Sequence, residues 1–203
     1  MRKFLIALIS LLIVIGGLGC EGKNLNRVVE SDSPENVINS FFSEFKKCNF
    51  EKAESFIVNK PLLNMNIDIY NELTPGEKRV IKYWNQRIGY EIVSSNIKGD
   101  KAIINTKVMA LNGEKIYKRY ISDIANLKKD LSIQDNKSKF NREYDKALIK
   151  EVRNKNNEIV TNTVTINLQN KDGNWYIEGD ENLFKALCGG LSLDKINNFN
   201  MGR

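Results

Sequence analysis

The stretch that decides the fold runs from Glu158 to Gly190 and reads EIVTNTVTINLQNKDGNWYIEGDENLFKALCGG. Its first part alternates branched apolar residues with threonines. This period of two is typical of a strand with one buried face. The apolar set is Val160, Val164, Ile166 and Leu168, and the polar set is Thr161, Thr163 and Thr165. The pattern therefore predicts a strand whose apolar set faces the core.

The second half of this stretch predicts a tight turn, a return strand and a closing helix. The turn is Lys171-Asp172-Gly173-Asn174, because Asp-Gly tolerates positive φ. Trp175-Tyr176-Ile177 forms the return strand. Asp180 is placed to cap a helix over residues 181–188, and Gly189-Gly190 is placed to end it.

The N-terminal residues predict an export signal. Arg2 and Lys3 precede an apolar run, small residues and then Cys20, which is the layout of a secretory signal peptide. A small-residue run that ends at a cysteine resembles a bacterial lipoprotein signal, and this implies cleavage before Cys20 and lipid on its sulfur. We therefore expect residues 1–19 to be a signal peptide and residues 20–32 a lipidated tether. The protein would then lie on the extracytoplasmic face of the cell membrane.

Two other interpretations of this leader stay open. An uncleaved membrane helix from Phe4 to Leu18 would be roughly 22 Å long, against a bilayer core of about 30 Å. Secretion without lipid, with Cys20 incidental, is the second. The short length disfavours the first, and the position of the cysteine disfavours the second.

Two further cysteines are open to two interpretations. Cys48 and Cys188 either pair in an oxidising compartment or serve as small, buried apolar residues. One bridge in a chain of 203 residues is no disulfide framework, which favours two thiols. The formal net charge of +6 is modest, and together with the export signal it argues against a nucleic-acid partner.

Helices are expected before the strands. Ser33-Pro34-Glu35 has the composition of a helix start, and the apolar residues after it recur at spacings of three and four. Asn49 is expected to end this helix and cap a shorter one. Thr74-Pro75-Gly76-Glu77 resembles a capping box and opens a helix to about Arg87, whereas residues 61–73 are loop or irregular helix. The apolar face of the first helix is Val37, Ile38, Phe41, Phe42 and Phe45.

A second hairpin and two long helices are expected in the middle of the chain. Strands over residues 89–98 and 101–111 flank Gly99-Asp100, a hairpin signal. Helical spacing then predicts helices over residues 114–131 and 138–153, since the apolar residues repeat every three or four positions. The first set is Ile116, Tyr120, Ile124, Leu127 and Leu131, and the second is Phe140, Tyr144, Ala147 and Leu148. We expect a helical insertion over residues 114–153 within a single domain of residues 33–203.

These motifs together resemble a known superfamily. Ser33-Pro34-Glu35, Asn49-Phe50-Glu51-Lys52-Ala53, Gly99-Asp100-Lys101-Ala102 and the segment 171–177 look like the nuclear transport factor two-like superfamily, with its cystatin-like cone fold. More narrowly, the chain is similar to lipoproteins of unknown function from Gram-positive bacteria, in which a DGxW strand precedes a helix ending in Gly-Gly. The resemblance implies an α+β fold in which N-terminal helices pack on a curved antiparallel sheet, with a cavity at the wide end. It does not imply an activity, because the superfamily hosts binders, partner modules and enzymes.

Catalytic chemistry finds little support in the composition. The chain has no His, which removes the commonest general base and metal ligand, and it has no zinc-type thiol spacing or phosphate-binding glycine pattern. The strand residues Tyr90, Glu91, Tyr176 and Glu178 are the remaining candidates for an inward-facing acid or tyrosine pair. We expect no catalytic residues, no metal and no cofactor.

The favoured hypothesis is a non-catalytic binding module held on the membrane by its lipid anchor. Its partner would be a small apolar ligand, a peptide or an envelope protein. The residues expected at an apolar pocket are Phe41, Phe42, Phe45 and Trp175. A cone-fold hydrolase or isomerase and a structural module of an envelope complex are the alternatives. The segment 112–157, with twelve Lys or Arg against seven Asp or Glu, is either a lipid-binding surface or a solvated helix face.

Overall fold

A computed structural model describes residues 33–58, 75–129, 137–192 and 195 of the chain. Within these ranges the protein is an α+β fold with one five-stranded mixed sheet, in the order β1-β5-β4-β3-β2. The signal peptide, Cys20, the tether and residues 61–73 were the subject of predictions that lie outside the described residues.

Three long strands form the body of the sheet. β2 (Gly89–Lys98) and β3 (Lys101–Leu111) form the expected hairpin, and β4 (Ile159–Lys171) pairs with β3 along its whole length. β5 (Asn174–Glu178) returns antiparallel to β4 through the turn at Asp172 and Gly173, both of which have positive φ. The alternation predicted for β4 is confirmed, since Val164, Ile166 and Leu168 are buried and the three threonines are exposed.

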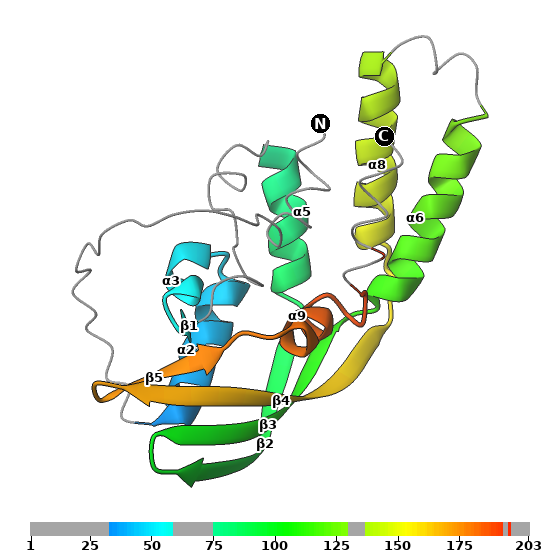
Figure 1. The fold of residues 1–203 in the computed structure, drawn as a ribbon. Coiled ribbons are helices and arrows are strands. Elements are labelled where there is room, and N and C mark those ends of the chain that lie inside the picture. The colour runs from blue at the N-terminus through cyan, green and yellow to red at the C-terminus, as the bar shows by residue number, and fades with distance from the viewer. Residues whose placement is uncertain (1–32, 59–74, 130–136, 193–194, 196–203) are drawn as a thin grey trace.

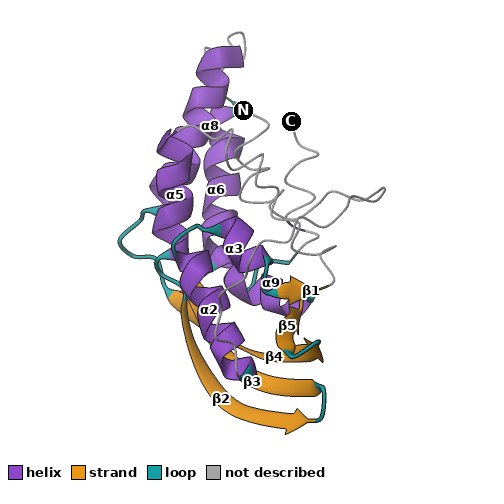
Figure 2. Ribbon diagram, turned by 90° about the vertical axis from the view of Figure 1, so that its left-hand side faces the viewer, coloured by secondary structure: helices purple, strands orange, loops and turns teal. Residues whose placement is uncertain are grey.

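Two helices cover one face of this sheet. α2 (Pro34–Lys46) packs on β5 and β2, and α9 (Glu181–Leu187) packs on β4 and β3. Figure 2 shows the sheet curving beneath α2. Both helices begin as their sequences predict, because the Ser33 hydroxyl accepts from the Asn36 N–H and the Asp180 carboxylate accepts from the Leu183 N–H. The buried face of α2 is the predicted set Val37, Ile38, Phe41, Phe42 and Phe45.

Four further helices of the described residues lie beside and above this layer (Figure 1). α3 (Phe50–Glu54) packs on α2, and α5 (Pro75–Asn85) lies between α2 and α8. α6 (Gly113–Leu127) leads away from the sheet after β3, and α8 (Lys137–Val152) returns to it before β4 (Figure 1). α6 and α8 pack against each other, and we call them the α6–α8 pair.

A charged network ties the base of the α6–α8 pair together. The Arg119 guanidinium donates to the Glu151 carboxylate and to the Asn157 side chain, and the Glu151 side chain is only 4 % exposed. The Asn157 amide then donates to the carbonyls of Glu151 and Val152, at 2.8 and 2.9 Å. These bonds give the last carbonyls of α8 a side-chain partner, as helix ends require.

Two glycines let the chain cross itself where α6 begins. The Gly113 N–H donates to the Gly189 carbonyl at 3.0 Å, so the start of α6 is bonded to the segment after α9. A Cβ on Gly189 would lie 1.7 Å from the Leu111 carbonyl oxygen, and one on Gly113 would lie 2.0 Å from the Cys188 carbonyl oxygen. Because both obstacles are backbone atoms, only glycine fits at these two positions.

Three expectations need correction. The sheet is mixed rather than antiparallel, because β1 (Ile57–Val58) pairs parallel to β5. A strand of two residues is too short to show a period in the sequence. Asn49 precedes α3, but its side chain does not cap that helix; it donates to the Glu44 carboxylate at 2.7 Å instead. The helix expected over residues 114–131 is α6, which ends at Leu127, earlier than expected.

Candidate functional site

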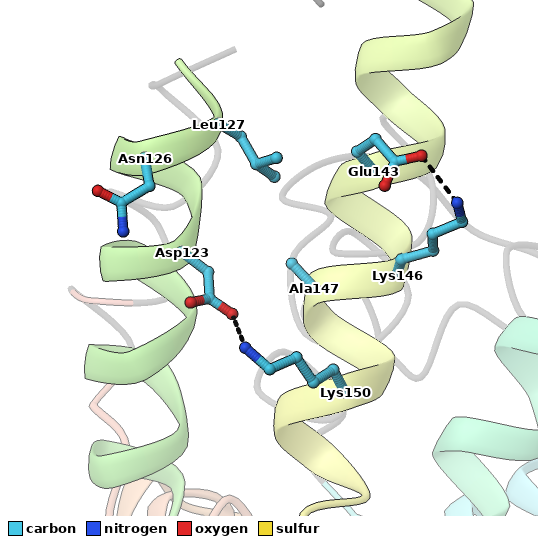
Figure 3. Close-up of a pocket in the computed structure, with 7 residues that line it drawn as sticks. All are labelled: Asp123, Asn126, Leu127, Glu143, Lys146, Ala147 and Lys150. Carbon is cyan, nitrogen blue, oxygen red and sulfur yellow. Dashed lines mark hydrogen bonds and ion pairs between the residues drawn. The ribbon is translucent and has the colours of Figure 1, made fainter. Parts of the chain in front are cut away.

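An open groove lies between α6 and α8 (Figure 3). Its volume is about 390 Å³. Leu127 from α6 and Ala147 from α8 face each other across it, and charged or amide side chains surround them (Figure 3). The groove is lined by Asp123, Asn126, Leu127, Glu143, Lys146, Ala147 and Lys150.

The sequence spacing explains why these residues meet. On α6, Asp123, Asn126 and Leu127 are three and four positions apart, which places them on one side of the helix. On α8, Glu143, Lys146, Ala147 and Lys150 have the same spacing. The Lys150 ammonium reaches across and donates to the Asp123 carboxylate at 2.8 Å, which joins the two sides (Figure 3).

Both carboxylates of the groove are engaged by lysines. Lys146 donates to Glu143, one helical turn away, at 2.8 Å. This hydrogen bond lowers the pKa of Glu143 from its ordinary value of 4.5. The hydrogen bond to Asp123 in turn raises the pKa of Lys150, with a further contribution from Glu151. Both shifts favour the charged forms of Glu143 and Lys150, so neither group is poised to exchange a proton near neutral pH.

The predicted ligand-binding residues lie in the core, away from this groove. Phe41 and Phe42 have no exposed surface, and Phe45 and Trp175 are 5 % and 7 % exposed. Phe42 stacks on Tyr90 with ring centroids 4.3 Å apart, and Phe41 and Phe45 pack on neighbouring rings. A ligand pocket at these residues stays a prediction.

Two polar atoms on the inner face of the sheet lack a hydrogen-bond partner within the described structure. They are the Thr106 hydroxyl on β3 and the Asn162 amide nitrogen on β4. Thr106 is fully buried, and its cross-strand partner Val164 is two residues from Asn162 on the same face. A buried polar group without a partner costs about 1–3 kcal/mol, so a ligand group or a water that bonded to either atom would be stabilising.

The four strand residues considered for catalysis are not brought together. Tyr90 lies on β2, stacked on Phe42, and its hydroxyl donates to Asn39 at 3.0 Å. Glu91 is exposed and pairs with Lys107 at 3.2 Å. Tyr176 and Glu178 lie on β5, which β4 and β3 separate from β2. No inward-facing pair forms among them.

The two described cysteines are not joined by a disulfide. Cys48 and Cys188 are both thiols, which agrees with the interpretation as small apolar residues. Burial raises the pKa of the Cys188 thiol, so it stays protonated at neutral pH. Within the described ranges, no three His, Cys, Asp or Glu side chains are grouped so as to hold a metal ion.

Comparisons with known proteins give no assignment. The chain matches no family model, and no similar curated protein or solved structure was found. Of the helices that the structure describes, none combines the length and the apolar character needed to cross a bilayer. The site must therefore be interpreted from its own chemistry.

Proposed function

We propose that the protein is a membrane-anchored, extracytoplasmic lipoprotein that acts as a non-catalytic binding module for a segment of an envelope protein. The observation that carries this proposal is the groove between α6 and α8, which has apolar walls at Leu127 and Ala147 and charged rims. An amphipathic helix in such a groove buries its apolar residues and keeps its polar face in water. Cys20, at the end of the apolar leader, supports the membrane address.

The electrostatics of the groove favour binding over catalysis. A general acid or base works best when its pKa lies near the operating pH. For a carboxylate to meet this condition, its neighbours must raise its pKa. Here Lys146 lowers the pKa of Glu143, and Asp123 is paired with Lys150. Rims with fixed charges of both signs are suited to selecting the register of a charged partner helix.

A small apolar ligand is the second candidate partner. It is favoured by the Thr106 hydroxyl and the Asn162 amide, which are buried without partners on the face that carries Val164. A ligand with an apolar body and one carbonyl or hydroxyl group would satisfy these atoms and contact the aromatic core. Phe41, Phe42, Phe45 and Trp175 would line its site.

We also propose that the fold is the cone fold of the nuclear transport factor two-like superfamily, with the α6–α8 pair as an inserted helical hairpin. The curved sheet with α2 on one face supports this (Figure 2). β3 and β4 pair directly from Leu111↔Ile159 to Lys101↔Gln169, so the strands on either side of the helices are already neighbours. Segments between two such strands are free to vary in length without disturbing the sheet.

Site-specific cross-linking tests the proposed partner. A photoreactive side chain is placed at Asn126, which lines the groove, or at the neighbouring exposed Ala125, which does not. We expect cross-linking from position 126 in membranes that hold the full chain, to a segment with apolar residues every three or four positions. Equal cross-linking from both positions, or none from position 126, would refute the groove as the site.

An apolar fluorescent probe tests the second candidate. Binding of the probe to the folded protein, with quenching of tryptophan emission, is expected if the core holds a ligand pocket. If the probe does not bind and Phe42→Ala only destabilises the fold, the small-ligand candidate should be dropped.

A further inference from the structure

The basic charge of the helices is not distributed as the sequence suggests. The segment 112–157 holds the excess of Lys and Arg, but ion pairs engage many of these cations. The pairs are Lys115 with Glu158, Arg119 with Glu151, Lys146 and Arg142 with Glu143, and Lys150 with Asp123. Among the described residues, a cluster of cations without such pairs lies on α5 and just after α5 and α8.

This cluster, which we call the basic face, consists of Arg79, Lys82, Arg87 and Arg153 around Tyr83. All four cations are exposed, and none has an ion-pair partner among the described residues. Arg79, Lys82 and Tyr83 are three and four positions apart, so they share one side of α5. The opposite side of the helix is buried in the core through Val80, Ile81 and Trp84.

Tyr83 holds two guanidinium groups close together. The Arg87 Cζ lies 3.3 Å from the centre of the Tyr83 ring, and the same side chain donates to the Tyr83 carbonyl at 3.0 Å. The Arg153 Cζ approaches this ring from α8, at 5.7 Å. The negative face of the ring offsets part of the repulsion between the two cations. Most of their N–H donors stay available, in the planar geometry that phosphate oxygens accept.

We propose that the basic face is a docking surface for the phosphate headgroups of an anionic membrane. The inference rests on the proposed lipid anchoring, which brings the domain to the bilayer. The chain from Cys20 to Ser33 spans at most roughly 45 Å when extended, so the anchor keeps the domain near the bilayer surface. Docking then turns the α5 side of the domain towards the lipid, because four unpaired cations gather there.

Lysine acetylation footprinting of the full chain tests this orientation. The chain is reconstituted into vesicles of phosphatidylcholine alone or of phosphatidylcholine mixed with phosphatidylglycerol. Lys82 reports on the basic face, while Lys98 and Lys101 at the β2–β3 turn are exposed internal references. We expect the labelling of Lys82, relative to these references, to fall about fivefold or more in the anionic vesicles. The effect should disappear at about 1 M salt, where charges are screened within about 3 Å.

Matched double variants separate the basic face from net charge. Arg87→Gln with Arg153→Gln should restore the labelling of Lys82, because each cation near the surface contributes roughly a fivefold factor. Lys171→Gln with Lys185→Gln removes the same charge at two other exposed positions, keeps the reference lysines and should leave Lys82 protected. Circular dichroism of each variant shows that it is folded. Equal effects of the two variants would overturn the proposal.

Three other outcomes are decisive. If Lys82 is labelled equally in both kinds of vesicle, the proposal is wrong. If soluble polyphosphate protects Lys82 to the same extent without vesicles, the assignment to a membrane surface is wrong. If the chain is not retained on neutral vesicles, the lipid anchoring fails, but protection of Lys82 on anionic vesicles would still support the basic face.

Discussion

Replacing Gly189 by alanine should break the contact between the start of α6 and the segment after α9. Gly189 has φ +62°, and a residue with a Cβ in this left-handed region is strained by about 1–2 kcal/mol. The new methyl would also lie 1.7 Å from the Leu111 carbonyl oxygen, which is far inside contact distance. The two backbone segments must therefore separate, which breaks the hydrogen bond from the Gly113 N–H to the Gly189 carbonyl.

The expected cost follows from these two effects. Leaving a buried backbone N–H without its partner adds about 1–3 kcal/mol to the strain. Gly189→Ala should therefore lower the free energy of unfolding by roughly 2 to 5 kcal/mol. Urea denaturation of the full chain measures this change. Unfolding is monitored by the fluorescence of Trp84 and Trp175, the two tryptophans of the sequence. Trp84 is a direct reporter, because its indole N–H donates to the Leu187 carbonyl close to the crossing.

Two neighbouring glycines separate strain from steric overlap. Gly190 has φ +88° but open space around its Cβ position, so Gly190→Ala should cost only the strain of about 1–2 kcal/mol. The Cβ of Gly113→Ala would lie 2.0 Å from the Cys188 carbonyl oxygen, but Gly113 has no positive φ. Its destabilisation should therefore come mainly from separation of the two backbone segments, not from backbone strain. If Gly189→Ala and Gly190→Ala destabilise the protein equally, the crossing does not have the role argued for it.

Three further predictions concern the anchor, a helix cap and one buried carboxylate. Cys20→Ala should prevent lipidation; a variant that matures to the same mass and stays on membranes would contradict the lipoprotein proposal. Asp180→Ala removes the acceptor of the Leu183 N–H and should cost about 1 kcal/mol in urea denaturation, and an unchanged midpoint would argue against the cap. The hydrogen bond from Asn49 lowers the pKa of Glu44 below 4.5, so its stabilisation is complete above that pH and is lost as the pH falls through the folded value. Glu44→Gln should therefore weaken the acid dependence of unfolding between about pH 5 and 3, and an identical dependence in this variant would assign it to other groups.

Turns and caps are the parts of this fold that the sequence predicts best. The β2–β3 hairpin has the predicted bounds, because Gly99-Asp100 acts through its own backbone preferences. α9 begins at the predicted residue and ends one residue earlier than predicted, at Leu187, and Asp180 and the glycines after the helix each act within a few residues. Such signals are local, so a single stretch of sequence contains the whole interaction.

Contacts between distant segments were not predictable in the same way. β1 has only two residues. Its parallel pairing to Ile177 and Glu178 depends on the direction in which the chain continues after α3. The groove depends on how α6 and α8 are rotated about their own axes. Their helical spacing was visible, but it does not tell which charged residue on one helix faces which on the other. Asp123 and Lys150 are 27 residues apart, and nothing in either segment alone indicates that they meet.

The rim of the groove and the base of the α6–α8 pair form one continuous chain of ion pairs. Lys150 contacts Asp123 in the groove at 2.8 Å and Glu151 in the base at 3.3 Å, and Glu151 is held by Arg119. Because Glu151 is buried and paired, removing either of its partners leaves a charge that is costly to bury. Lys150 is itself 66 % exposed, so its two ion pairs link the rim to the base but contribute little to stability. A partner that binds in the groove meets charges of both signs on its rim, joined through Lys150 to the buried Glu151, and this arrangement favours recognition of one register.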